Sequence, residues 1–396
     1  MRGALAGRAR VYLEWVINEA LPFWASGGFD TVRHRFHERL DFAGRPLDVP
    51  QRAMVQSRQI YVYAHAAKLG WFEPGAELAS RALESLLRTY GSSNGRTSSF
   101  IFSVDGAGRP LSTDRDAYTH AFVLLAIAWV YQLTGDAALL VLAERIIGFI
   151  DSELTDVTHG GLYDAAPITV RTKRQNPLMH FLEAYLALEA AAPGRGYRER
   201  ASQLVELLDR RLVRDEYLIE HFDEAWTFHP DVKRAHVFEP GHHFEWCWLL
   251  SEYDRLCQAD TTLRAGRLHA TARDCGISDH GLIHDELNTD RVIIKSSHRV
   301  WPHTEAIKAA VAQERAGAPG SRELAEAMAG TLLENFVGHP FAGGWIDHLD
   351  DKRRPLVDYV PASTLYHLFV AATELASREP SEAIGARDQL EIGIKS

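Results

Sequence analysis

The sequence has few cysteines, no long hydrophobic run and no excess of basic residues. Its three cysteines, Cys247, Cys257 and Cys275, form no C-x-x-C pair. An odd number with this spacing argues against both a disulfide framework and a zinc knuckle. The longest apolar run, around residues 121–130, is too short to cross a bilayer. These absences favour a protein of the reducing cytoplasm.

Acidic residues outnumber basic ones by 53 to 43, which gives a net charge of −10. Because both signs are interspersed along the chain, we expect a small neutral or modestly polar ligand and no nucleic acid. Glu14 and Glu19 interrupt the apolar N-terminal residues, so this segment does not read as a signal peptide, and we expect no membrane partner. The motifs H-E-x-x-H, G-x-x-x-x-G-K-[ST] and G-x-S-x-G are also missing. We therefore expect no metal and no other cofactor.

The chain does contain a repeat of about 62 residues. Polar side chains that are capable of catalysis recur at this spacing in apolar stretches: Arg58, His120, His180, His242, Glu305 and His367. Six such units account for almost all of the 396 residues, which is typical of a closed ring of repeated units. We therefore expect one domain over residues 1–396, with one residue of each unit pointing toward a shared centre.

Each unit combines a mostly apolar helix with a charged, one-sided amphipathic helix. The apolar helices are expected at 52–70, 114–134, 176–192, 241–257, 300–316 and 362–377, and the charged ones at 8–26, 74–91, 136–152, 198–212, 260–275 and 320–337. Apolar helices belong inside and charged helices outside. The predicted fold is therefore all-α, an (α/α)6 barrel of six inner and six outer helices.

Prolines mark the starts of four inner helices, at Pro177, Pro240, Pro302 and Pro361. His180, His242 and Glu305 follow within three residues of the first three prolines, which places these side chains at one end of the barrel. The positive ends of the helix dipoles meet there. Such a field favours neutral imidazole and stabilises a developing oxyanion.

His242 and Glu245 are three residues apart, so the carboxylate can orient the imidazole for proton transfer. A histidine bonded at a helix start, with Glu245 in a buried ion pair, explains the spacing equally well. His243 points about 100° away and is expected to be structural. His120 is expected to pack or to bond to backbone.

Two further histidines share the phase of His242, namely His180 and His367, which favours function over a core role for both. Arg58 opens an apolar helix without an acidic neighbour at helical spacing, and we favour a ligand oxygen as its partner. Trp301 offers an apolar ring face for a sugar. Histidines near neutral pKa, one arginine and two carboxylates suit proton transfer beside a carbonyl.

Several stretches resemble the N-acylglucosamine 2-epimerase superfamily, with the bacterial D-mannose isomerase branch, which includes relatives acting on sulfoquinovose, as the nearest match. They are Gln56-Ser-Arg58, Asn176-Pro-Leu-Met-His180, Glu239-Pro-Gly-His-His-Phe-Glu-Trp246, Trp301-Pro-His-Thr-Glu305 and Val360-Pro-Ala-Ser-Thr-Leu-Tyr-His367. The resemblance implies an (α/α)6 barrel that interconverts sugars without metal or nicotinamide. His303 departs from the glutamine expected in many relatives, and this difference could alter hydroxyl contacts.

The resemblance also implies roles for the site residues. His242 and His367 would be the acid/base pair, His180 a substrate-binding or ring-opening histidine, and Arg58 the ligand of the enediolate oxygen. Sugar hydroxyls would be held, or the bases oriented, by Asn176, Glu245, Trp301 and Glu305.

The expected reaction is isomerisation of D-mannose to D-fructose, with 2-epimerisation of a sugar as the alternative. A glycoside hydrolase that uses Glu245 and Glu305, and a non-catalytic carbohydrate-binding protein, are further alternatives. Phosphorylated sugars are disfavoured because no basic cluster is evident near the motifs, although Arg171, Lys173 and Arg174 lie just upstream of Asn176.

Overall fold

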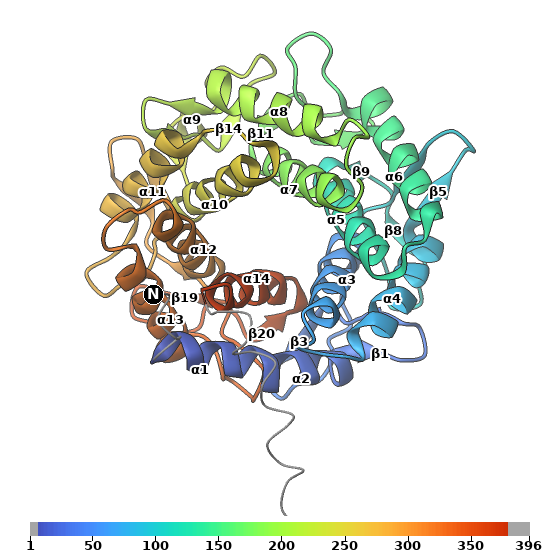
Figure 1. The fold of residues 1–396 in the computed structure, drawn as a ribbon, viewed down its shortest axis with the longest axis horizontal. Coiled ribbons are helices and arrows are strands. Elements are labelled where there is room, and N and C mark those ends of the chain that lie inside the picture. Colours follow the sequence, from blue (N-terminus) through green and yellow to red (C-terminus); the bar gives the residue numbers. More distant parts are fainter. Residues whose placement is uncertain (1–6, 379–396) are drawn as a thin grey trace, which may run out of the picture.

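The computed structural model describes residues 7–378 and shows two concentric rings of helices (Figure 1). The inner ring consists of α3 (Ala53–Lys68), α5 (Ala117–Thr134), α7 (Asn176–Ala191), α10 (Pro240–Cys257), α12 (Trp301–Arg315) and α14 (Leu365–Ala376). The outer ring consists of α1 (Arg8–Trp15) with η1 (Val16–Ala20) and α2 (Leu21–Ser26), α4 (Gly75–Tyr90), α6 (Ala137–Phe149) with η2 (Ile150–Leu154), α8 (Tyr197–Leu207) with η3 (Leu208–Leu212), α11 (Thr262–Gly276) and α13 (Ser321–Asn335). The predicted (α/α)6 barrel is confirmed within this range.

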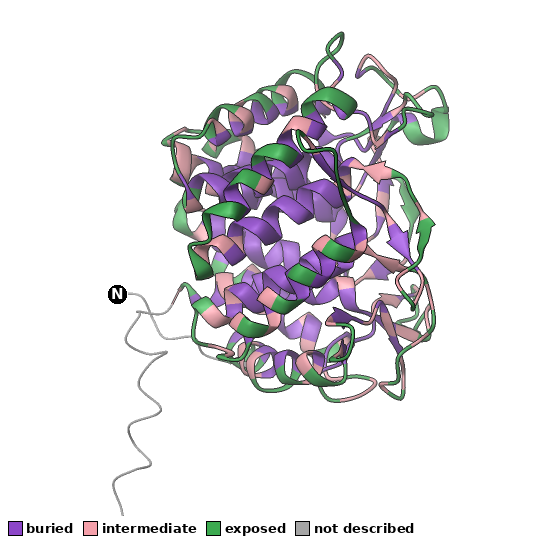
Figure 2. Cartoon of the chain, turned by 90° about the vertical axis from the view of Figure 1, so that its right-hand side faces the viewer, coloured by how far each residue is buried: buried purple, intermediate pink, exposed green. Residues whose placement is uncertain are grey.

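Burial explains why the two rings differ in sequence. Inner helices are enclosed by neighbours on all sides, so they are apolar nearly all round (Figure 2). The inner helix α5 is long and apolar enough to cross a membrane by composition, but 67% of it is buried within the structure. The outer helix α4 buries Ala79, Leu83 and Leu86 and exposes its charged side chains. One-sided patterning therefore marks the outer ring.

A ring of short antiparallel ladders joins neighbouring units at one end of the barrel. The strand before each inner helix pairs with a strand in the loop before the next inner helix. The pairs are β4 (Gln51–Arg52) with β7 (Ser103–Val104), β9 (Arg115–Asp116) with β10 (Ala165–Ala166), β11 (Lys173–Arg174) with β14 (His221–Phe222), β15 (Val237–Phe238) with β16 (Glu286–Asn288), β18 (His298–Arg299) with β19 (His348–Leu349), and β20 (Tyr359–Pro361) with β3 (Arg39–Asp41). The last pair closes the ring, because it links the end of the chain to its beginning.

The remaining short elements lie in the connections between the barrel helices. They are β1 (Phe29–Asp30) with β2 (Arg35–Phe36), β5 (Gly91–Ser93) with β6 (Ser98–Phe100), β8 (Pro110–Ser112) on β7, β12 (Val213–Arg214) with β13 (Tyr217–Leu218), β17 (Ile293–Lys295) on β16, the short α9 (Val232–Ala235) and the 3-10 turn η4 (Ala362–Thr364). Since every inner helix begins at the ladder ring, the N-termini of all the inner helices face one mouth.

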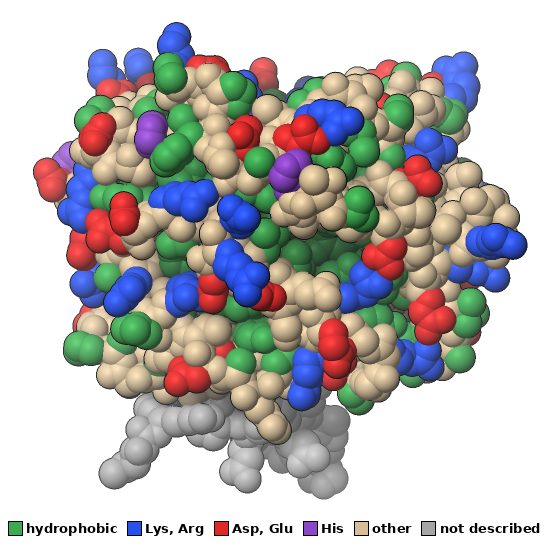
Figure 3. Space-filling view, turned by 90° about the horizontal axis from the view of Figure 1, so that it is seen from above, with side chains coloured by type: hydrophobic (Ala, Val, Ile, Leu, Met, Phe, Trp, Pro, Cys, Tyr) green, Lys and Arg blue, Asp and Glu red, His purple; other side chains and the backbone are tan. Residues whose placement is uncertain are grey.

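Charged side chains of both signs are intermingled on the face of the molecule in Figure 3. Many are paired within one outer helix, such as Arg210 with Glu206 at 2.5 Å and Arg10 with Glu14 at 3.0 Å. Exposed pairs of this kind contribute about 0–1 kcal/mol each. The stability of the barrel therefore rests mainly on its apolar core.

Candidate active site

A cavity of about 210 Å³ lies at the mouth where the inner helices begin. Its walls are Arg58, Tyr118, Asn176, His180, Glu239, His242, Glu245, Arg299, Trp301, Asp347, Ser363, Thr364 and His367. The wall residues that come from inner helices lie within the first six residues of those helices. All but one of the eight predicted site residues are thus brought together, the exception being Glu305.

His367 is held by a carboxylate behind the cavity wall. Its Nδ1 lies 2.8 Å from Oε1 of Glu305. Burial lowers the pKa of His367 well below 6.5, and the positive charges of Arg58 and Lys308 add to this effect. The imidazole is therefore neutral at pH 7. With Nδ1–H donated to Glu305, the lone pair of His367 is on Nε2.

Glu305 is fully buried and has no place in the cavity wall. Its Oε2 lies 2.6 Å from the ammonium of Lys308, one helical turn further along α12. The expectation that Glu305 touches sugar hydroxyls directly is therefore wrong. Of its two implied roles, the structure favours orientation of His367.

His242 carries the opposite charge state. Its Nδ1 lies 2.9 Å from Oε2 of Glu220, and Glu239 is 4.0 Å away. Burial opposes a charge on this ring, but the two carboxylates outweigh burial and raise the pKa of His242 to about 9. The predicted neutral imidazole is therefore wrong here, because two nearby carboxylates exceed the effect of the helix dipole. The carboxylate bonded to the ring is Glu220, from the loop after β13, and not Glu245 as the spacing suggested.

His180 has a carboxylate partner on its own helix. Its Nδ1 lies 3.2 Å from Oε2 of Glu183, and the hydroxyl of Tyr366 donates to the other oxygen of Glu183. Burial lowers the pKa of His180 to about 4, although Glu183 opposes this shift. His180 is thus a second neutral imidazole in the cavity wall.

Arg58 brings a buried positive charge to the cavity. Its guanidinium donates to the Tyr118 hydroxyl at 2.6 Å and to the Ser363 carbonyl at 3.2 Å, and it lies 4.3 Å from the ring centroid of Phe122. Arg58 has no carboxylate partner among residues 7–378, and its Nε is buried without a hydrogen bond. A buried guanidinium in this state suits an anionic or strongly polar ligand oxygen.

Two further polar atoms of the wall are buried without a hydrogen-bond partner in the described part of the chain, Oδ1 of Asn176 and Oε1 of Glu245. Burial, followed by the charge of Glu305, raises the pKa of Glu245 to about 8. Trp301 lies near both catalytic candidates, with its ring centroid 5.0 Å from that of His242 and 5.6 Å from that of His367. Orphaned polar atoms around an aromatic wall fit a ligand with several hydroxyl groups and an apolar face.

Several cavity residues were missed from the sequence. Tyr118 is the second residue of α5, and its position relative to the other site residues on the helical repeat could have identified it. Asp347, which accepts a hydrogen bond from Thr364 at 2.7 Å, lies in a loop and had no sequence signal. Arg299 also reaches the wall, but Glu239 at 2.6 Å and Asp285 at 2.9 Å already neutralise its charge.

Three other histidines share a purely structural role. In each of them Nδ1 faces the carbonyl four residues earlier, and Nε2 accepts a backbone N–H from a neighbouring loop. The donors are Phe100 for His120 at 3.1 Å, Leu218 for His243 at 3.0 Å and Ile283 for His303 at 2.9 Å. The structural roles expected for His120 and His243 are therefore confirmed, although His120 departs from the rule that one residue of each repeat points to the centre. His303 does not contact the cavity.

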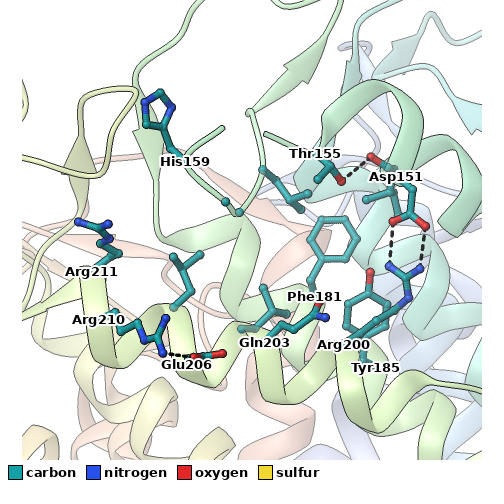
Figure 4. Close-up of a pocket in the computed structure, with 16 residues that line it drawn as sticks. Asp151, Thr155, His159, Phe181, Tyr185, Arg200, Gln203, Glu206, Arg210 and Arg211 are labelled. Atoms are coloured by element: carbon teal, nitrogen blue, oxygen red, sulfur yellow. Dashed lines mark hydrogen bonds and ion pairs between the residues drawn. The ribbon is translucent and has the colours of Figure 1, made fainter. Parts of the chain in front are cut away.

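Three larger cavities lie elsewhere. One, of about 430 Å³, lies between η2, α7 and α8, where Arg200 pairs with Asp151 at 2.7 Å and Arg210 with Glu206 (Figure 4). Another, of about 330 Å³, opens between the C-terminal halves of the inner helices, and the third, of about 460 Å³, lies between η3 and α11. None of the three is lined by His242, His367 or Arg58.

Three sets of side chains within residues 7–378 have the spacing of a metal site, and two of them lie at the cavity: Glu245, Glu305 and His367, and Glu220, Glu239 and His242. However, Glu305 already meets His367 with one oxygen and the Lys308 ammonium with the other. In the second set, Glu220 bonds to His242 and Glu239 pairs with Arg299. Both donor sets fit a proton-transfer site better than a divalent cation.

Comparison with known proteins identifies relatives over nearly the whole chain. A protein named mannose-6-phosphate isomerase from Rhizobium meliloti is 31% identical, with 94% of this chain and 96% of the relative covered. A cellobiose 2-epimerase from Bacteroides fragilis is 24% identical, with 72% of this chain and 77% of the relative covered. A crystal structure of D-mannose isomerase shares the fold, with a TM-score of 0.86 at 21% identity and coverage of 95% of this chain and 100% of the other. The family model of N-acylglucosamine 2-epimerase matches residues 35–371. The chain therefore belongs to the N-acylglucosamine 2-epimerase family of sugar isomerases and epimerases.

Proposed function

We propose that the protein is an aldose–ketose isomerase that converts D-mannose to D-fructose. The observation that supports this most strongly is the pair His242 and His367, which both lie near the Trp301 ring and have opposite charge states. Two titratable groups whose environments drive their pKa values apart are suited to act as an acid and a base at the same pH.

In this proposal the imidazolium of His242 protonates the ring oxygen while the neutral imidazole of His180 takes the proton of the anomeric hydroxyl, so that the pyranose opens to the aldose. Nε2 of His367 then removes the proton from C2 and forms a cis-enediolate. Arg58 stabilises the oxygen that becomes negative. Return of the proton to C1, with transfer of the O2 hydroxyl proton to O1, gives the ketose. Proton donation to the opposite face of C2 would instead give the epimer.

The dimensions and charge of the cavity favour an uncharged monosaccharide. Sites for drug-sized ligands span about 300–1,000 Å³, whereas this cavity has about 210 Å³. Of the two arginines in its wall, Arg299 is already neutralised by Glu239 and Asp285, and Arg58 is needed for the enediolate. The third cation of the described wall, the imidazolium of His242, is needed as the acid, so none is left to hold a phosphate, although one relative is named for a phosphorylated sugar.

A glycosidase mechanism fits the same cavity poorly. It requires two carboxyl groups that flank a bond. Glu305 is fully buried behind His367, so Glu245 has no second carboxylate of the predicted pair across the cavity.

Proton NMR of the chelator-treated protein with D-mannose in heavy water tests the proposal. Fructose deuterated at C1 is the expected product. Glucose labelled at C2 without fructose would make the protein a 2-epimerase. Faster turnover of mannose 6-phosphate than of mannose would overturn the uncharged substrate, and activity on N-acylhexosamines or sulfoquinovose alone would overturn D-mannose.

A further inference from the structure

Lys308 is a fully buried lysine below the floor of the cavity. Its ammonium lies 2.6 Å from Oε2 of Glu305 and 3.7 Å from the ring centroid of Trp248. Burial opposes its charge, but Glu305, Glu245 and Glu183 outweigh burial and raise the pKa of Lys308. Desolvation of an ammonium costs several kcal/mol unless the group is well paired. The lysine is therefore a permanent cation beneath the site.

Lys308 and His367 meet opposite oxygens of the same carboxylate. Oε1 of Glu305 is 2.8 Å from Nδ1 of His367, and Oε2 faces Lys308. Glu220, the carboxylate behind His242, is arranged differently. Its Oε2 meets Nδ1 of His242 and also accepts a hydrogen bond, at 2.9 Å, from the neutral amide of Gln175. Glu305 is thus balanced by a lysine, whereas Glu220 is balanced by its histidine.

This difference decides where a proton can reside. If the His367–Glu305 pair gains one proton, that proton makes an imidazolium, or it moves to Glu305 and drives the ring hydrogen onto Nε2. In both arrangements Nε2 is protonated and cannot act as a base. We propose that Lys308 is a positioning residue that keeps this additional proton off the His367–Glu305 pair and so preserves Nε2 of His367 as the base. The inference rests on the proposed function for its catalytic consequence.

Other charged and titratable groups face the pair from each surrounding element, and their balance sets the effect. They are Arg58 on α3, His180 and Glu183 on α7, His242 and Glu245 on α10, Tyr366 on α14 and Tyr12 on α1. Lys308 itself is in direct contact with Glu305, unlike the other cationic groups. Its removal therefore favours proton uptake by the pair.

The test is Lys308→Met with ¹⁵N-labelled histidine. NMR of the sugar-free protein at pH 7 should show Nε2 of His367 unprotonated in the wild type and protonated in the variant. We expect kcat for the isomerisation to fall by about 10²-fold at pH 7, with KM little changed. The acidic limb of the kcat profile should move to higher pH, so activity should recover as pH rises. Lys308→Arg, which retains the charge, should restore part of the activity.

Lys173→Met is a matched control. Lys173 is also fully buried, lies 2.5 Å from Oδ2 of Asp156 and faces the Trp226 ring at 4.8 Å, but it lies outside the cavity wall. Its loss should lower stability without changing the protonation of His367 or the pH profile. An unprotonated Nε2 in folded Lys308→Met, or an equal change in Lys173→Met, would overturn the inference.

A double variant keeps the test valid if Lys308→Met does not fold. Glu305→Gln combined with Lys308→Met contains neither charge of the pair, and in this background loss of the lysine should not lower kcat further. A further fall as large as that predicted for the single variant would contradict the inference. Because the NMR measurement needs no sugar, it stands even if the wild type fails to isomerise mannose.

Discussion

Replacement of Glu220 by glutamine should convert His242 from an acid into a weakly charged ring. The rise of its pKa from 6.5 to about 9 reflects the nearby carboxylates, of which Glu220 has the larger effect and Glu239 the smaller. At about 1.36 kcal/mol per pH unit, this rise corresponds to roughly 3 kcal/mol in favour of the imidazolium. The amide removes the closer charge, so we expect the pKa of His242 to fall by at least about one pH unit.

The assay is the pH profile of kcat/KM. The acid must be protonated, so activity is lost as pH rises through the pKa of His242, near 9 in the wild type. Glu220→Gln should move this basic limb downward and reduce activity at pH 8.5 by about threefold or more, while activity near pH 6 is retained. Glu239→Gln should cause a smaller shift. An unchanged basic limb in folded Glu220→Gln would refute the assignment of His242 as the acid.

Other variants test the remaining roles. His367→Ala should abolish turnover and preserve the thermal melting curve, so substantial residual isomerisation by the pure variant would exclude it as the base. Arg58→Ala should lower kcat by about 10²–10³-fold, as for loss of one oxyanion donor, and a loss confined to KM would contradict this role. His120→Ala should leave kcat intact and lower the free energy of unfolding by roughly 1–3 kcal/mol, because the buried Phe100 N–H loses its acceptor. Since the folded-state pKa of His242 is raised, its contribution to stability should be complete below pH 6.5 and disappear as pH rises through about 9. Urea unfolding across this range should show the fall in wild type and a smaller one in Glu220→Gln.

The repeat in the sequence was sufficient to predict the barrel, because helical phase and burial are both local properties. It also placed His180, His242 and His367 in one cavity. The spacing alone would place His120 there as well, but the backbone-bonding role expected for His120 is the one observed, because a residue two positions along a helix from Tyr118 lies about 200° away. In that unit Tyr118 faces the cavity, and His120 bonds to the backbone of Phe100.

Partners on loops could not be predicted from the sequence. Asp347 lines the cavity and Glu220 bonds to His242 behind its wall, because the ladders that join neighbouring units fix these loops over the mouth. Such placement depends on pairing between distant segments and not on helical spacing. The charge of His242 could not be predicted for the same reason, because it is set by Glu220 on a loop and not by Glu245 on the same helix.

The two catalytic candidates thus belong to His–carboxylate pairs that differ in the group behind the carboxylate. Glu220 has a neutral amide as its other partner, so His242 supplies the compensating positive charge and becomes the acid. Glu305 has Lys308, so no charge is required of His367, which remains a base. The lysine below the floor is therefore what allows two chemically similar pairs to perform opposite steps of one proton transfer.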